Sequence, residues 1–184
     1  MVSQGPEMKA KLIFVPLAGI AIAGGPAYAT VYLSVQQAQA ALFPGATFLP
    51  QPRTLTEDQV KAIEHASGVH VLTKEMKVWR VSSGGWFIVD EVVGKHEYIP
   101  FALGLDDQGA VKGIEILEYR EAYGDQIRNP EWQKQFLGKD AATKLQLGRN
   151  IRNISGATLS CKHITDGVER LLVTYELVLK PSAH

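Results

Sequence analysis

The sequence predicts an α+β domain in which antiparallel strand hairpins pack with helices. Two apolar hairpin patterns occupy the middle of the chain, a capped amphipathic helix precedes them, and a longer amphipathic helix ends the chain. Hairpins flanked by helices, rather than alternating strand–helix units, are typical of this class. The 184 residues suffice for one ordinary domain and a short appendage.

Composition excludes several classes of protein. The 19 basic residues are balanced by 19 acidic ones, so the chain lacks the basic excess of a nucleic-acid binder that relies on phosphate neutralisation. A hydrophobic content of 46% is enough to build a core. The single cysteine, Cys161, rules out an intrachain disulfide and a multi-cysteine metal site. We therefore expect no nucleic-acid partner and no metal centre.

Residues 1–29 are predicted to be an export signal. An apolar run at residues 12–23 follows two lysines, and residues 27–29 match the small-x-small cleavage pattern. Residues 1–7 form a candidate extension ahead of a better start at Met8. The alternative is an uncleaved single-span anchor. The expected location is periplasmic or otherwise extracytoplasmic, with membrane anchoring if the signal is not removed.

The rest of the chain divides into an N-terminal extension, residues 30–55, and a domain over residues 56–178. In the extension, a thin apolar stripe predicts a short helix over residues 30–42, and three prolines predict a loop over residues 43–53.

The domain begins with a helix. Thr56 and Gln59 have capping-box spacing, and Gly68 is the natural stop.

Two strand pairs follow this helix. Residues 77–82 and 86–93 form the first hairpin, and residues 98–105 and 110–119 form the second. The alternation in the last strand is imperfect, which predicts a strand covered on both sides.

Two further helices are predicted after the hairpins. Pro130 opens a short helix that ends at Phe136, because proline at the first helical position costs no hydrogen bond. The terminal helix runs from about Leu159 to Leu177, with an apolar face at helical spacing.

The most informative stretch is Ser155-Gly156-Ala157-Thr158, directly before the terminal helix. The first amides of a helix lack internal partners and the dipole is positive there, so a phosphate would be stabilised. Gly156 allows close approach of the backbone, Ala157 keeps the approach uncluttered, and Thr158 and Ser160 add hydroxyl groups. The alternative is ordinary capping by Ser155, Thr158 or Ser160 with no ligand.

This stretch, continued by Leu159 and Ser160, resembles the flavinylation motif of the FMN-binding domain family. That family includes the covalent-FMN subunits of the sodium-pumping NADH:quinone oxidoreductase and of Rnf-type electron-transport complexes. The resemblance implies that Thr158 carries FMN through a phosphoester bond. It also implies that an exported flavin transferase attaches the group, with FAD as donor and magnesium as helper.

Other blocks fit the resemblance, which covers residues 76–175. Residues 121–124 are similar to the family's Glu-Thr-Pro-Gly turn near the flavin, and residues 135–139 resemble its Phe-x-Gly-Lys stretch. Two positions depart from the pattern: Arg152 stands where the family often has Asp, and Tyr123 replaces a proline.

The resemblance implies a set of cofactor-binding residues and leaves their individual roles open. Glu121 is a candidate hydrogen-bond partner of the flavin, with a solvated turn residue as the alternative. The stacking candidates have core packing as their alternative. A second Gly-Ala-Thr at residues 45–47 is treated as a decoy. The implied cofactor-binding residues are Ser155, Gly156, Ala157, Thr158, Leu159, Ser160, Glu121 and Tyr123, and the stacking candidates are Trp132, Tyr123, Tyr119, Trp86 and Phe136.

The expected function is an exported flavoprotein that carries electrons between a membrane-bound redox partner and another carrier. Electron transfer requires no acid, base or nucleophile, so no catalytic residue is assigned. Two alternatives remain open. One is a ligand-binding or sensory module of the same fold without covalent flavin, and the other is a flavin-dependent reductase of a small exported substrate.

Overall fold

The structure, a computed structural model, describes residues 30–180. Its main element is a six-stranded antiparallel sheet in the order β2-β4-β5-β6-β7, in which β3 also pairs with β4. A second sheet joins β1 and β8. The predicted export signal lies outside the described residues. The strands are β1 (Thr30–Val31), β2 (Phe48–Pro50), β3 (Arg53–Thr54), β4 (Glu75–Val81), β5 (Trp86–Val93), β6 (Tyr98–Leu105), β7 (Val111–Ile116) and β8 (Glu118–Tyr119).

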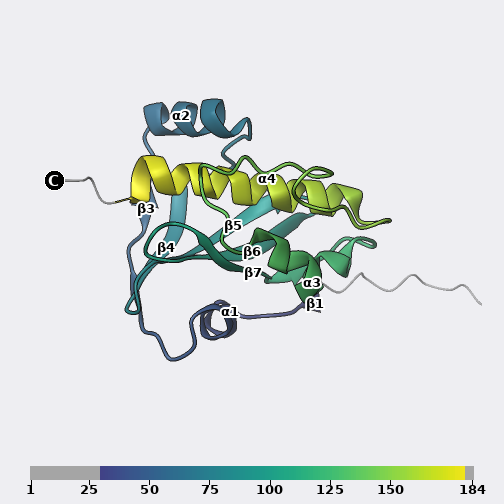
Figure 1. The fold of residues 1–184 in the computed structure, drawn as a ribbon, viewed down its shortest axis with the longest axis horizontal. Coiled ribbons are helices and arrows are strands. Elements are labelled where there is room, and N and C mark those ends of the chain that lie inside the picture. The colour runs from purple at the N-terminus through teal and green to yellow at the C-terminus, as the bar shows by residue number, and fades with distance from the viewer. Residues whose placement is uncertain (1–29, 181–184) are drawn as a thin grey trace, which may run out of the picture.

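Helices cover this sheet on both faces. α4 lies on one face, α1 lies on the other, and α2 lies on the outer side of α4 (Figure 1). None of the helices within residues 30–180 is long and apolar enough to cross a membrane. The helices are α1 (Val35–Leu42), α2 (Glu57–Ser67), α3 (Pro130–Gln133) and α4 (Thr158–Thr174), with 3-10 turns at Asp125–Arg128 and Lys134–Phe136 and a π-helical turn at Tyr175–Leu179.

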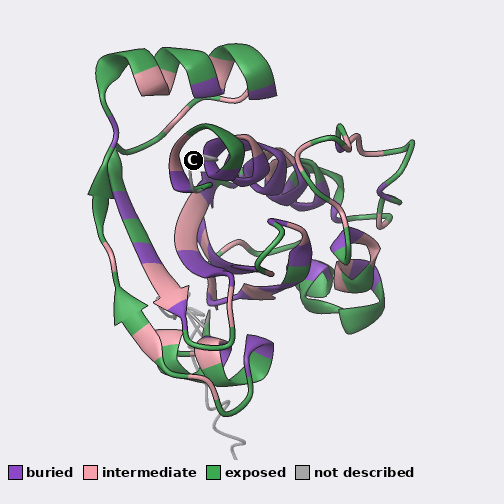
Figure 2. Ribbon diagram, turned by 60° about the vertical axis from the view of Figure 1, so that its left-hand side comes forward, coloured by how far each residue is buried: buried purple, intermediate pink, exposed green. Residues whose placement is uncertain are grey.

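Successive side chains of a strand point to opposite faces of the sheet, as the strand period of two requires. The buried side chains of the strands therefore belong to two cores, one on each face. Figure 2 shows α4 buried over most of its length, whereas α2 is exposed on its outer side. Each fully buried large apolar side chain stabilises the fold by about 1.5–3 kcal/mol. The core under α4 includes Ile88, Phe101, Leu103, Ile164 and Val168, and the core over α1 includes Ala38, Leu42, Phe43, Phe87 and Ala102. The predicted α+β class is confirmed.

Glycines in β6 and β7 allow α1 to approach the sheet. A Cβ on Gly113 would lie 2.5 Å from Leu42 Cδ2, and one on Gly104 would lie 2.9 Å from the Phe43 ring. On its opposite face, β7 contacts α3 and the two 3-10 turns, so this strand is covered on both sides, as its irregular alternation predicted.

The predicted helix caps and hairpins are confirmed. Thr56 caps α2 through a complete capping box with Gln59, and Gly68 ends the helix in the left-handed conformation with φ 75°. Both predicted strand pairs form, although the last one is divided into β7 and β8. Asn129 caps α3 and Pro130 is its first residue.

In the N-terminal extension, the predicted loop was wrong, whereas the predicted helix forms but starts later than predicted. Residues 43–53 contain β2 and the start of β3 rather than an uninterrupted loop. β2 pairs with β4 alone, and proline is tolerated on such an edge strand. The helix predicted over residues 30–42 begins only at Val35, because Ser34 forms a capping box with Gln37.

Candidate functional site

The start of α4 is the centre of the candidate site. Thr158 is the first residue of the helix, and the N-cap residue is Ala157, which has no side-chain acceptor. The alternative that Ser155, Thr158 or Ser160 caps this helix is therefore wrong. By contrast, α1 and α2 both begin with complete capping boxes. The positive end of the α4 dipole thus meets the loop without a capping side chain.

Gly156 and Ala157 have different roles in the turn before α4. Gly156 is exposed with φ 85°, and a Cβ there would contact nothing within 4 Å. Glycine is therefore favoured at this position by the left-handed backbone conformation and not by a lack of space for a side chain. Ala157 is 2% exposed and belongs to the core under α4, so it anchors the turn.

The three hydroxyl groups near the helix start are in different environments. Ser155 and Thr158 are exposed, whereas Ser160 is buried. The Asn153 side-chain amide donates a hydrogen bond from Nδ2 to Thr158 Oγ1 at 2.8 Å. Sequence reasoning missed Asn153, because nothing in its spacing from Thr158 indicates this contact. Leu159 is 49% exposed and lies beside Thr158 on the helix.

Ser160 is committed to the protein interior. The Tyr119 hydroxyl donates to the carbonyl oxygen of Tyr123 at 2.6 Å, and it lies 2.7 Å from Ser160 Oγ. Because a tyrosine hydroxyl has one proton, Ser160 must be the donor in the second contact. Burial raises the pKa of Tyr119, so the phenol remains protonated. The predicted cofactor hydroxyl of Ser160 therefore has a structural partner instead.

These bonds place the turn at residues 121–124 against the first turn of α4. Gly124 has φ 102°, and a Cβ on it would lie 2.5 Å from the Tyr119 hydroxyl and 2.6 Å from Ser160 Oγ. The preceding residue, Tyr123, has a side chain that is 84% exposed. An aromatic ring in solvent is thus attached to a backbone that is fixed beside the helix start.

Glu121 holds a neighbouring loop. Its Oε1 accepts hydrogen bonds from the backbone amides of His96 at 2.5 Å and Glu97 at 3.0 Å. Burial alone would raise the pKa of Glu121, but backbone amides of this loop hold it below its ordinary value. Gly94 provides the space, because a Cβ on it would lie 2.5 Å from Glu121 Oε1. This oxygen is therefore engaged by the protein itself.

The other aromatic candidates lie in the core. Only Tyr123, among the five stacking candidates, is exposed. Core packing, the alternative for each of the other four, is what the structure shows. The four buried side chains are Trp86 (4% exposed), Tyr119 (3%), Trp132 (4%) and Phe136 (0%).

The loop that leads to α4 is braced by residues of the preceding helical segment. Trp132 Nε1 donates to the carbonyl oxygen of Arg152 at 2.7 Å, and Gln135 Oε1 accepts from the Arg152 amide at 2.8 Å. Arg152 Nε also lies 3.3 Å from that oxygen, and its side chain is exposed. The guanidinium is thus held by a neutral amide at the edge of the site.

Two further polar residues lie early in α4. Burial lowers the pKa of His163, opposed by the nearby carboxylate of Asp166, and burial raises the pKa of the Cys161 thiol. Cys161 is fully buried, so it acts as a small core residue. His163 is half-buried and favours its neutral form, which makes it a weak attractor of phosphate.

The decoy at residues 45–47 has a structural role. The Thr47 amide donates to Ser82 Oγ at 2.9 Å and the Thr47 carbonyl accepts from the Ser82 amide, so this segment holds the β4–β5 turn. The next element is β2, not a helix.

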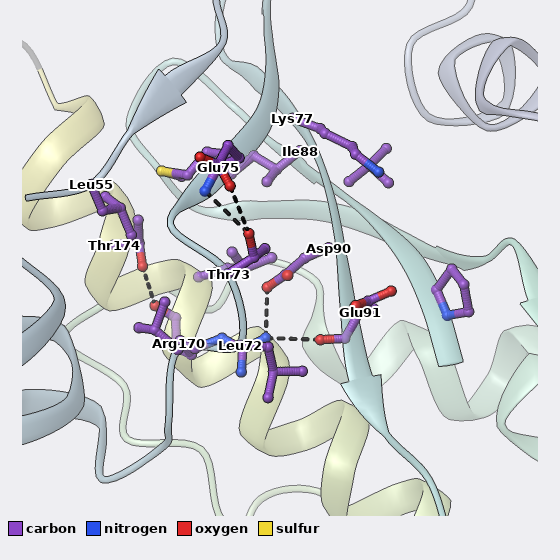
Figure 3. A pocket seen from close by; sticks show the side chains of 15 residues that line it. Leu55, Leu72, Thr73, Glu75, Lys77, Ile88, Asp90, Glu91, Arg170 and Thr174 are labelled. Carbon is purple, nitrogen blue, oxygen red and sulfur yellow. Dashed lines mark hydrogen bonds and ion pairs between the residues drawn. The ribbon is translucent and has the colours of Figure 1, made fainter. Parts of the chain in front are cut away.

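A cavity of about 440 Å³ lies at the other end of α4. It is bordered by the loop after α2, by β4 and β5, and by Arg170 (Figure 3). Arg170 donates to Asp90 Oδ2 at 2.7 Å, to the Glu91 carbonyl at 2.9 Å and to the His70 carbonyl at 2.6 Å. Twelve residues of helix, or about 18 Å, separate Arg170 from Thr158. This cavity is therefore separate from the helix start that the Ser155–Thr158 motif indicates.

Comparisons with known proteins bear on the segment that contains the helix start. Residues 94–173 match the FMN-binding domain family. The solved structure of one component of the Na(+)-translocating NADH-quinone reductase from Parabacteroides distasonis aligns with a TM-score of 0.47 and 13% sequence identity, over 74% of this chain and 80% of that chain. A search of curated proteins finds no match.

Proposed function

Because residues 94–173 match the FMN-binding domain family, we propose that the chain is an exported flavoprotein that carries FMN covalently on Thr158 and acts as an electron-transfer carrier. One observation carries this proposal. Within the matched segment, Thr158 presents an exposed hydroxyl at the first position of α4, where the N-cap residue has no side-chain acceptor.

The residues at the helix start fit a phosphate. A phosphodiester keeps one negative charge, which the helix dipole and the first backbone amides stabilise. Gly156 leaves open space at its Cβ position, and Ala157 points into the core, so the approach is clear. The hydroxyl of Ser155 is exposed in the same turn, and Arg152 lies at its edge.

The residues near Thr158 also fit an aromatic ring. Tyr123 is fixed through its backbone and exposed through its side chain, and Leu159 adds exposed apolar surface. Both suit a flat ring system that stacks on aromatic or aliphatic groups. When bound, FMN supplies reversible uptake and release of electrons, whose potential the protein tunes by stacking, hydrogen bonding and burial.

A covalent link suits an exported carrier. It replaces a binding equilibrium by a local concentration on the order of mM, so the group is not lost by dilution. The proposal therefore includes a flavin transferase for maturation, with FAD as donor and magnesium as helper. It also includes an extracytoplasmic location directed by residues 1–29, and a membrane-bound redox partner. The chain itself needs no acid, base or nucleophile for electron transfer.

Intact mass tests the proposal. The full chain is co-expressed with a flavin transferase, beside a sample made without the transferase. We expect a mass gain of one FMN minus water only with the transferase, and its complete loss in Thr158→Ala. A yellow protein with unchanged mass would indicate a non-covalent flavin module, and a colourless one a ligand-binding or sensory module. Saturable turnover of a defined acceptor by the isolated protein would indicate a reductase instead.

A further inference from the structure

Asn153 contacts the proposed acceptor oxygen directly. Its Nδ2 lies 2.8 Å from Thr158 Oγ1 although the two residues are five positions apart. We infer that Asn153 is a positioning residue for flavin attachment, because its amide fixes the Thr158 hydroxyl in the orientation from which the phosphoester forms. The inference rests on the proposed function.

The backbone next to Asn153 is held on its N-terminal side. Arg152 is clamped through its carbonyl by Trp132 and through its amide by Gln135. Ile151, one residue earlier, is fully buried. The Asn153 side chain therefore extends from a fixed point, and its amide reaches Thr158 without the cost of ordering a mobile loop.

The direction of the hydrogen bond matters for the chemistry. An amide Nδ2 can only donate, so it occupies one lone pair of Thr158 Oγ1 and leaves the hydroxyl proton and the second lone pair free. Attachment then forms an Oγ1–P bond and breaks the P–O–P bond of FAD, so AMP leaves and the hydroxyl proton is released to solvent. A hydroxyl held in one rotamer starts this step closer to its reactive geometry.

Two variants test the inference. Asn153→Ala removes the side chain, and Asn153→Asp keeps its shape but replaces the donor by a carboxylate. The full chain is incubated with flavin transferase, FAD and magnesium, and incorporation is followed by intact mass. We expect Asn153→Ala to lower kcat about three- to tenfold, the effect of losing one hydrogen bond. KM for FAD should stay unchanged. Asn153→Asp should be slower still, because its charge repels the incoming phosphate.

A second measurement does not depend on flavin. Three-bond couplings of Thr158 in the unmodified chain should report one side-chain rotamer in the wild type and averaged rotamers in Asn153→Ala. Wild-type incorporation kinetics in Asn153→Ala, or unchanged couplings, would overturn the inference. A wild-type chain that acquires no flavin at all would instead overturn covalent attachment, so the two failures are distinguishable.

Discussion

Tyr119 and Ser160 are 41 positions apart in the sequence and share a buried hydrogen bond of 2.7 Å. The bond joins the end of β8 to the first turn of α4. Because the Tyr119 hydroxyl also donates to the Tyr123 carbonyl, this one group fixes the positions of both the exposed aromatic ring and the helix start.

The first prediction concerns this hydrogen-bond pair. Tyr119→Phe leaves the Ser160 hydroxyl and the Tyr123 carbonyl without their partner, so we expect a loss of about 1–3 kcal/mol in the free energy of unfolding. Ser160→Ala should cost less, because Tyr119 still donates to Tyr123. Urea denaturation of both single variants and the double variant measures the coupling. Simple additivity of the two losses would contradict the described arrangement.

The second prediction distinguishes the effect of backbone strain on stability from an effect on flavin incorporation. Gly156→Ala and Gly138→Ala both place a Cβ at positive φ, at 85° and 70°, with nothing within 4 Å. Each should destabilise the chain by about 1–2 kcal/mol in thermal unfolding. Gly156→Ala alone should also reduce flavin incorporation, since only Gly156 lies in the turn directly before Thr158, the proposed acceptor. Equal incorporation in the two variants would show that the turn conformation is unimportant for attachment.

The third prediction is a pH dependence. The folded pKa of Glu121 is lowered, so its contribution to stability is complete above the unfolded value of about 4.3 and is lost as pH falls through the lower folded value. Glu121→Gln should therefore reduce stability at pH 7, and the difference from wild type should shrink toward about pH 3. Urea unfolding across this range measures it. Glu131→Gln, at an exposed surface position, is the matched control, and a pH-independent difference for Glu121→Gln would count against the loop contacts.

The fourth prediction concerns the buried ion pair at the cavity. The Arg170 and Asp90 side chains are only 5% and 15% exposed, so Asp90→Ala leaves a buried charge without its partner. We expect a loss of about 3–5 kcal/mol in unfolding free energy, and a smaller loss when Arg170→Met is added. Flavin incorporation at Thr158 should persist at temperatures where the variants remain folded. A double variant less stable than Asp90→Ala would refute this account.

The fifth prediction tests the exposed ring. Tyr123→Ala should change stability by no more than about 0.5 kcal/mol, because the side chain is largely in solvent. If the ring stacks on the flavin, its removal should raise flavin fluorescence and shift the midpoint potential. Tyr123→Phe keeps the stacking surface and should resemble the wild type. Identical spectra for all three proteins would assign the flavin to another surface.

The parts of the fold that the sequence predicts are those determined by residues close together in the chain. The capping box at Thr56, the stop at Gly68 and the hairpin alternation each act within a few residues, and all three are confirmed. β2 and β3 could not be predicted, because strands of three and two residues carry little pattern and their prolines suggest a loop. Pairing with β4 stabilises them, and that pairing is not local.

In the candidate site too, features that depend on adjacent residues could be predicted, whereas features that depend on distant residues could not. The motif locates Thr158 and the helix start, because both depend on adjacent residues. The roles of Ser160 and Glu121 depend on partners more than twenty positions away, so their hydroxyl and carboxylate were predicted as ligands but are engaged internally. Asn153 lies close in sequence, yet its contact with Thr158 depends on how Trp132 and Gln135 shape the loop.

The pairing of β1 with β8 sets where the chain enters the fold. Thr30 is opposite Tyr119, the residue that also braces the start of α4. The first described residue therefore lies on the same side of the molecule as Thr158, the proposed attachment residue, rather than beside the cavity near Arg170. If the proposed function is correct, any group joined to the chain ahead of Thr30 would enter on the flavin side of the fold.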